Sequence, residues 1–166
     1  ANNVAIAVAA NDYFIPYCAT FLKSMAEHSN SDKNYDILLL SQDVSDINVK
    51  NVKKMLSAWK NISLRVLDPS VLIDQYTFHI EGHFSKETYY RLVLPELLPN
   101  YDKVLYLDSD MIAMDDVAKI YDENIDGYLL AACHDADTAG LYNGYRKDKK
   151  DYTDKILKLK EPYQYF

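Results

Sequence analysis

An apolar run that ends in two acids constrains the fold of this chain more than any other feature. Four consecutive apolar residues, Val104 to Leu107, are followed by Asp108-Ser109-Asp110. A continuous run of this kind, rich in β-formers, predicts a strand buried on both faces, as in the centre of a parallel sheet. Because side chains alternate along extended backbone, Asp108 and Asp110 are expected to leave the end of this strand on the same side.

Ligands of open α/β sheets bind in the crevice outside the carboxyl ends of the strands. Two neighbouring carboxylates at that place repel each other unless a cation lies between them, and carboxylate oxygens suit a hard divalent ion. The pattern therefore predicts a metal site formed by Asp108 and Asp110. An Asp-x-Asp sequence is also common on exposed loops, and it is the position at the end of an apolar strand that favours the metal site here.

The rest of the chain alternates between apolar runs and helical patterns. Four further short apolar runs are predicted to be strands: residues 4–10, 35–40, 62–67 and 128–133. Apolar residues at helical spacing predict helices that begin near Pro16, after a capping Ser45, and at Ser85. Strands that alternate with helices predict an α/β fold, with right-handed crossovers and a mostly parallel sheet flanked by helices.

The helix predicted to begin at Ser85 carries a basic residue with two interpretations. Its apolar face is expected to consist of Tyr89, Leu92 and Val93. Arg91 follows Glu87 by four residues, which is typical of a surface ion pair. A guanidinium also offers bidentate hydrogen bonds to a phosphate or a carboxylate. The helical pattern alone leaves both interpretations of Arg91 open.

Polar pairs also follow two other predicted strands, at residues 11–12 and 134–135. Because parallel strands end at one edge of the sheet, we expect these pairs to face the same rim as the acids, as a preformed ligand site requires. Two aromatic residues, Tyr13 and Phe14, come next to the first pair. One of them is expected in the core, and the other would offer a face on which a planar base stacks.

Composition narrows the classes of partner. The chain has 166 residues, 49% of them hydrophobic and 26% charged, which is enough for the core of one domain. A net charge of -7 argues against a general nucleic-acid binder. Cys18 and Cys133 do not suggest a disulfide framework, and no run approaches the ~18 apolar residues of a membrane span. We therefore expect a cytoplasmic location and leave peripheral association with the inner face of the membrane open.

Three segments together resemble glycosyltransferase family 8, which includes bacterial lipopolysaccharide galactosyl- and glucosyltransferases and glycogenin. They are VAAND at residues 8–12, HFSKETYYRL at 83–92 and VLYLDSDM at 104–111. The resemblance implies a GT-A fold, which is Rossmann-like, and a UDP-sugar donor. It also implies a Mn²⁺ or Mg²⁺ ion and transfer of a galactose or glucose, with retention of configuration, to a saccharide or lipid-linked saccharide acceptor.

The resemblance also implies roles for individual residues. Positions that hold the uridine in the family are matched by Ala9, Ala10, Asn11 and Phe14. Phe14 stands where a stacking tyrosine is usual, so the ring is kept and the hydroxyl is lost. Arg91 matches a basic residue that reaches the donor, which favours the functional interpretation of this side chain. Asp135 matches a carboxylate that accepts hydrogen bonds from hydroxyls of the donor sugar.

The same resemblance assigns the acid pair to the metal. Asp108 and Asp110 match the metal-binding acids of the family, and Ser109 lies between them near the ribose. An Asn-Ala-Gly segment, an acceptor-side Asp-Gln region and a late metal-binding His come further along in the family. The given chain ends at Phe166, so we expect the residues that act at the anomeric carbon to lie beyond it.

The expected organisation is a nucleotide-sugar-binding α/β domain over residues 1–139, which would be half of a larger domain. Residues 140–166, rich in Tyr and Lys, would lead into the acceptor-side half. Two other functions fit part of the pattern. One is a non-catalytic fragment that binds sugar nucleotides. The other is a phosphatase of the haloacid dehalogenase type, which also uses Asp-x-Asp after an apolar strand but carries it on the first strand.

Overall fold

The computed structural model describes residues 2–78, 85–134, 140 and 145–159. The chain divides into two compact units, Ala1–Glu123 and Asn124–Phe166, and each is described by itself. The division predicted after residue 139 stays a prediction. One predicted site residue, Asp135, lies outside the described residues.

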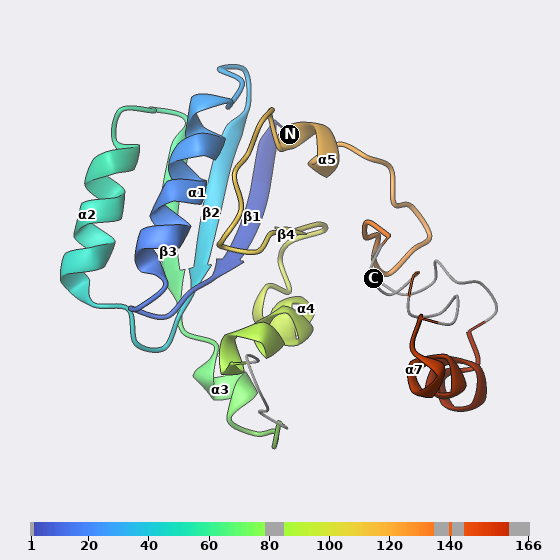
Figure 1. The fold of residues 1–166 in the computed structure, drawn as a ribbon. Helices are drawn as coiled ribbons and strands as arrows, with labels where there is room; N and C mark the ends of the chain where they lie inside the picture. The colour runs from blue at the N-terminus through green and yellow to red at the C-terminus, as the bar shows by residue number, and fades with distance from the viewer. Residues whose placement is uncertain (1, 79–84, 135–139, 141–144, 160–166) are drawn as a thin grey trace. The chain divides into compact units, whose positions relative to one another are not determined.

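The first unit is built on a four-stranded parallel sheet in the order β3-β2-β1-β4. Its strands are β1 (Asn3–Ala9), β2 (Asn34–Leu40), β3 (Ile62–Leu67) and β4 (Leu105–Tyr106). The connecting helices are α1 (Ile15–Glu27) and α2 (Asp46–Leu56), which lie together on one face of the sheet (Figure 1). The predicted parallel α/β sheet is therefore confirmed.

Shorter helical segments follow the third and fourth strands. They are α3 (Ser70–Ile73), the 3₁₀ helix η1 (Lys86–Val93), α4 (Leu94–Leu97) and α5 (Ala118–Tyr121). In the second unit, α7 (Lys147–Tyr152) continues into a π-helical turn, η3 (Thr153–Leu157). No helix among the described residues is both long enough and apolar enough to cross a membrane.

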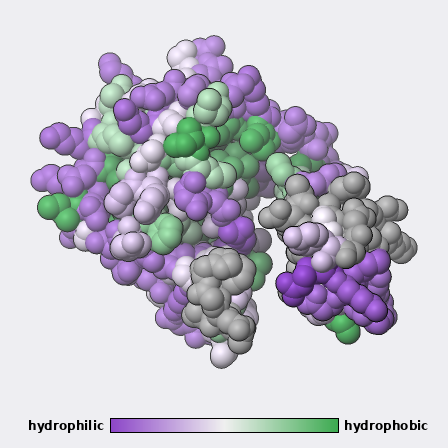
Figure 2. Space-filling view, viewed as in Figure 1, coloured by the Kyte–Doolittle hydropathy of each residue, from purple (hydrophilic) through white to green (hydrophobic). Residues whose placement is uncertain are grey.

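The two faces of β1 pack against different helices because alternate side chains point to opposite sides. Val4, Ile6 and Val8 belong to the core formed with α1 and α2. Ala7 and Ala9 belong to a second core with α3, η1 and α4, where their small side chains allow a close approach. The sheet is thus covered on both faces, while the outer surface in Figure 2 is mainly hydrophilic with separate hydrophobic patches.

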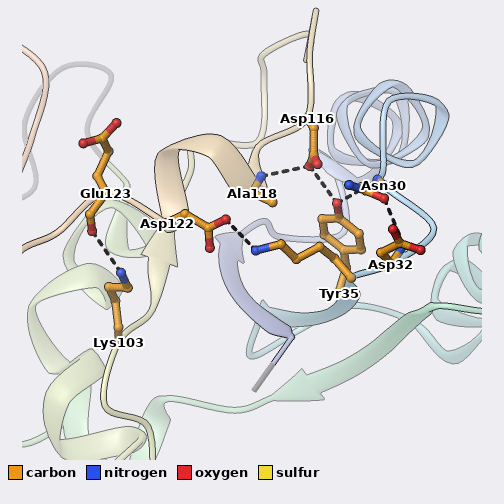
Figure 3. A network of polar contacts seen from close by, with 9 residues as sticks. Asn30, Asp32, Tyr35, Lys103, Asp116, Ala118, Asp122 and Glu123 are labelled. Atoms are coloured by element: carbon orange, nitrogen blue, oxygen red, sulfur yellow. Dashed lines mark hydrogen bonds and ion pairs between the residues drawn. The ribbon is translucent and has the colours of Figure 1, made fainter.

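The segment that follows the acid pair returns to the opposite end of the sheet, near the N-terminus (Figure 1). A polar network holds it there (Figure 3). Asp116 accepts a hydrogen bond from the Tyr35 hydroxyl at 2.7 Å, and Asp122 pairs with Lys33 at 2.5 Å. The Lys103 ammonium donates to the backbone carbonyl of Glu123 at 3.0 Å. These contacts fix both ends of the chain segment that contains the acids.

Two of the predicted strands differ in the structure: one is shorter than predicted, and the other is not a strand. The predicted strand buried on both faces is only Leu105–Tyr106, and it is half-buried because it is the last strand of the described sheet. The predicted strand at residues 128–133 is exposed and irregular, beginning after Gly127 with φ 81°. β-propensity does not make a strand without a hydrogen-bonding neighbour, and no described strand pairs with this run.

The segment after Ser85 also differs from its prediction. It is a 3₁₀ helix, in which residues three apart share a face, so Tyr90 and Val93 are buried and Leu92 is exposed. The next helix, α4, begins directly after it and carries Pro95 in its first turn. Proline is tolerated there because that turn does not use its N–H group.

The packing of β1 predicts a large cost for truncating its central side chain. Ile6 is 0% exposed, so Ile6→Ala is expected to lower the free energy of unfolding by about 2–5 kcal/mol. Ile47 on α2 is 67% exposed, and Ile47→Ala should change it by less than about 0.5 kcal/mol. Urea denaturation of both variants measures the difference, and equal losses would contradict the assigned core.

Candidate functional site

A cavity of about 430 Å³ lies at the carboxyl ends of β1 and β4. It is lined by residues from the end of β1, the start of α1, η1 and the end of β4. These are Ala9, Ala10, Asn11, Phe14, Ser85, Glu87, Thr88, Arg91, Tyr106, Asp108, Ser109 and Asp110. The structure therefore brings together Ala9, Ala10, Asn11, Phe14, Arg91 and the residues of the Asp108-Ser109-Asp110 sequence, for which the family resemblance implied binding roles. Their binding roles stay predictions.

The end of β1 forms a compact wall of this cavity. Ala9 and Ala10 are buried, and their small side chains leave room beside the backbone. The backbone N–H of Phe14 donates to the side-chain oxygen of Asn11 at 3.0 Å, which fixes the turn into α1. Pro16 occupies the first turn of that helix, as predicted. The turn therefore presents the aromatic ring of Phe14 to the cavity.

The aromatic residues beside this turn are all on the surface. The ring of Phe14 contacts Tyr13 and Tyr17, with centroid separations of 5.8 and 5.5 Å. All three rings are exposed, so the prediction that either Tyr13 or Phe14 belongs to the core is wrong. Ile15 and Cys18 fill the core from α1 instead, because α1 turns its buried face away from residues 13, 14 and 17.

Arg91 is placed over the cavity by η1. Its Nη2 atom donates to Oδ1 of Asp108 at 2.8 Å, and its Nε donates to the Thr88 carbonyl at 3.1 Å. The side chains of Arg91 and Asp108 are 42% and 55% exposed, so the pair is open to a ligand. An ion pair with this exposure contributes little to stability, up to about 1 kcal/mol. The observed partner of Arg91 is thus an acid of the site rather than Glu87.

The acid pair follows β4 at once. Leu107 N donates to the carbonyl of Ala7 at 3.0 Å, which extends the pairing of β1 with β4 to the residue before Asp108. The chain then turns, with Ser109 buried and both acids exposed to the cavity. Although the strand ends earlier than predicted, Asp108 and Asp110 share the same cavity.

These acids fit part of a divalent metal site. Two exposed carboxylates that share a polar cavity are oxygen donors of the kind that Mg²⁺ and Mn²⁺ prefer. Among the described residues, no group of three His, Cys, Asp or Glu side chains could hold a metal ion. Asp108 and Asp110 would therefore supply two ligands and leave the remaining positions for other groups.

The sequence model of the family described as Glycosyl transferase family 8 matches this chain over residues 5–166. The chain belongs to glycosyltransferase family 8. Its fold is that of the GT-A glycosyltransferases, as the resemblance of the three segments predicted. The Asp-x-Asp pair follows the fourth strand of the sheet rather than the first, which is also unlike the phosphatase alternative.

Solved structures of other glycosyltransferases resemble this family 8 chain. The apo structure of the bifunctional glycosyltransferase WbbM has a TM-score of 0.84 and 29% identity, over 99% of this chain and 30% of that chain. The galactosyltransferase LgtC in complex with donor and acceptor sugar analogs has a TM-score of 0.58 and 28% identity, over 73% of this chain and 43% of that chain.

A curated relative is glycosyltransferase GlyF of Streptococcus pneumoniae. It is 29% identical over 133 residues, which are 78% of this chain and 31% of the relative. The family 8 chain thus spans less than half the length of these relatives.

Several residues that line the cavity were not predicted from the sequence to face a ligand. Ser85, Glu87 and Thr88 lie on the same segment as Arg91, and Tyr106 lies within the apolar run. Their presence in the family-like segments 83–92 and 104–111 was a signal, but the helical pattern did not show which of them face a ligand. The 3₁₀ winding of η1 decides this, because it places Thr88 and Arg91 on one face.

Asp12 does not line the cavity, although it was expected at the same rim. Its carboxylate accepts hydrogen bonds at 2.8 Å from the backbone N–H of Ser45, the Ser45 hydroxyl and the Asn48 amide. These hydrogen bonds lower the pKa of Asp12, and the bond from the backbone N–H of Ser45 has the largest effect. Ser45 precedes α2 as predicted, but its hydroxyl binds Asp12 instead of capping the helix. Asp12 therefore joins the starts of α1 and α2.

The lowered pKa of Asp12 predicts a pH-dependent contribution to stability. This stabilisation is fully present above the unfolded pKa of about 3.9 and is lost as the pH falls through the folded pKa. Asp12→Ala should lower Tm at pH 7, and the difference from the wild type should shrink below about pH 4. Thermal denaturation followed by circular dichroism measures it, with Asp32→Ala as the control. A difference that grows in acid would contradict this role.

Proposed function

We propose that this chain binds the donor in a metal-dependent, retaining glycosyltransferase that moves a galactose or glucose from a UDP-sugar to a saccharide acceptor. The observation that carries the proposal is the shared cavity, in which the acid pair, Arg91 and the ring of Phe14 converge. The LgtC neighbour, whose structure holds donor and acceptor sugar analogs, supports a sugar donor and a sugar acceptor. A lipid-linked saccharide, met at the inner face of the membrane, is a second form of acceptor.

The chemistry asks the protein to stabilise the charge that develops on the leaving diphosphate. Unit charges about 4 Å apart interact by about 1 kcal/mol in water but about 4 kcal/mol near a protein surface. A bound Mn²⁺ or Mg²⁺ would supply positive charge to the diphosphate as a Lewis acid. Asp108 and Asp110 would hold this ion and transfer no proton.

The other cavity residues would bind and orient the donor. The Arg91 guanidinium can donate hydrogen bonds to phosphate oxygens, and its positive charge would offset part of the negative charge of the acids. Phe14 would stack on the uracil, beside Ala9, Ala10 and Asn11, and Ser109 would lie near the ribose.

The metal role of the acids is tested by UDP binding. Asp110→Asn is expected to weaken UDP binding in manganese by more than about a hundredfold, because the neutral amide holds the ion poorly. Isothermal titration calorimetry with and without manganese measures this loss. Asp102→Asn, which changes an exposed carboxylate outside the cavity, is the matched control and should bind UDP normally. Unchanged affinity in Asp110→Asn would refute the metal site.

A second variant tests the proposed contact with the donor sugar. Asp135→Ala should leave UDP binding unchanged and weaken binding of the intact UDP-sugar, because only the sugar hydroxyls would lose an acceptor. Competition between UDP and a panel of UDP-sugars, followed by thermal shift in manganese, compares the two ligands. Equal losses for UDP and UDP-sugar would count against this role of Asp135.

The alternative of a non-catalytic sugar-nucleotide-binding fragment makes a different prediction. Such a fragment would bind UDP-sugars with manganese and transfer nothing. A transfer assay with labelled UDP-galactose and UDP-glucose, run beside the binding assay, distinguishes the two functions. Release of phosphate from a generic phosphoester would instead favour phosphatase chemistry.

A further inference from the structure

The aromatic ring of Tyr106 lies against the guanidinium of Arg91 in the cavity. The Cζ atom of Arg91 is 4.4 Å from the centroid of this ring, a distance typical of a cation–π contact. Both residues line the cavity, and Tyr106 also packs against the second core, which covers the face of the sheet next to η1. One side of the Tyr106 ring is therefore anchored in the second core.

Three contacts from different elements hold the same guanidinium. The Thr88 carbonyl accepts from Nε within η1, and Asp108 accepts from Nη2 after β4. Tyr106 supplies the third contact, from β4 itself, to the face of the group. Arginine side chains lose rotamer freedom when held in one geometry, so a charge that is already positioned binds a ligand at lower entropic cost.

We propose that Tyr106 is a positioning residue, whose ring holds the Arg91 guanidinium toward the diphosphate of the nucleotide sugar. The inference rests on the proposed function and adds a residue that acts through Arg91. Since Tyr106 pairs with Ala7 in the parallel ladder, the sheet determines where the ring lies. A group supported by a strand is placed more accurately than one supported by a loop.

The ring of Tyr106, whose centroid lies 4.4 Å from Cζ of Arg91, is the part of the side chain to which the positioning role is assigned. The attraction between the guanidinium and the face of the ring comes from the ring quadrupole. Phenylalanine keeps this quadrupole and should replace tyrosine, whereas leucine should not.

UDP binding in manganese, measured by calorimetry on the full chain, tests the proposal. Tyr106→Phe should keep the affinity within about twofold, and Tyr106→Leu should weaken it by about fivefold, in line with a partly exposed cation–π contact. In the Arg91→Gln background, Tyr106→Leu should cause no further loss, because the ring would act only through the guanidinium. An equal loss in that background, or in Tyr106→Phe, would overturn the proposal.

A measurement without nucleotide separates this proposal from the proposed function. The ring current of Tyr106 should shift the NMR signal of the Arg91 Nε–H group, and Tyr106→Leu should abolish that shift while Tyr106→Phe keeps it. If the signal does not depend on the ring, the positioning role is refuted. A ring-dependent signal in a protein that binds no UDP would support the positioning role and refute the proposed function. If Tyr106→Leu lowers Tm, Tyr106→Met serves as the second non-aromatic variant.

Discussion

The parallel pairing of β1 with β4 is the constraint on which the site depends. Ile6 pairs with Leu105 and Ala7 with Tyr106, and the hydrogen bond from Leu107 N to Ala7 O continues the ladder. Because parallel strands in register end at the same edge, Asp108 emerges beside the turn that follows Ala9. Two chain segments about a hundred residues apart therefore meet at this edge, although only a short stretch of parallel pairing joins them.

The elements around this pairing keep the short strand in place. On one face, Ala7 and Ala9 let η1 pack closely, and Tyr90 and Val93 fill the space between them. Lys86 forms an ion pair with Asp74, which links the start of η1 to the end of α3. On the other face, Ala113 N donates to the Ser24 hydroxyl of α1 at 2.9 Å, just after the acids. The segment η1, which carries Arg91, is thus held on one face of the sheet. The segment that follows the acid pair is held on the other face.

Charge balance gives Arg91 a particular importance in this acidic protein. A net charge of -7 would repel the diphosphate of the proposed donor, so its binding would require local positive charge. Among the described residues that line the cavity, Arg91 is the only basic one, and it forms an ion pair with Asp108. The guanidinium would thus partly neutralise the acids before a metal ion binds and would donate to the phosphates afterwards.

The sequence alone determined the order of β1, α1, β2, α2 and β3, since apolar runs and helical spacing are local signals of burial. It also identified the cavity residues that match positions of the family, such as Phe14, Arg91 and the acid pair. Only the tertiary structure decided that residues 128–133 form no described strand and that β4 is short. It also decided that Asp12 binds the start of α2 and that Arg91 pairs with Asp108. Strand pairing and side-chain partners depend on which distant segments become neighbours, and local periodicity carries no information about that.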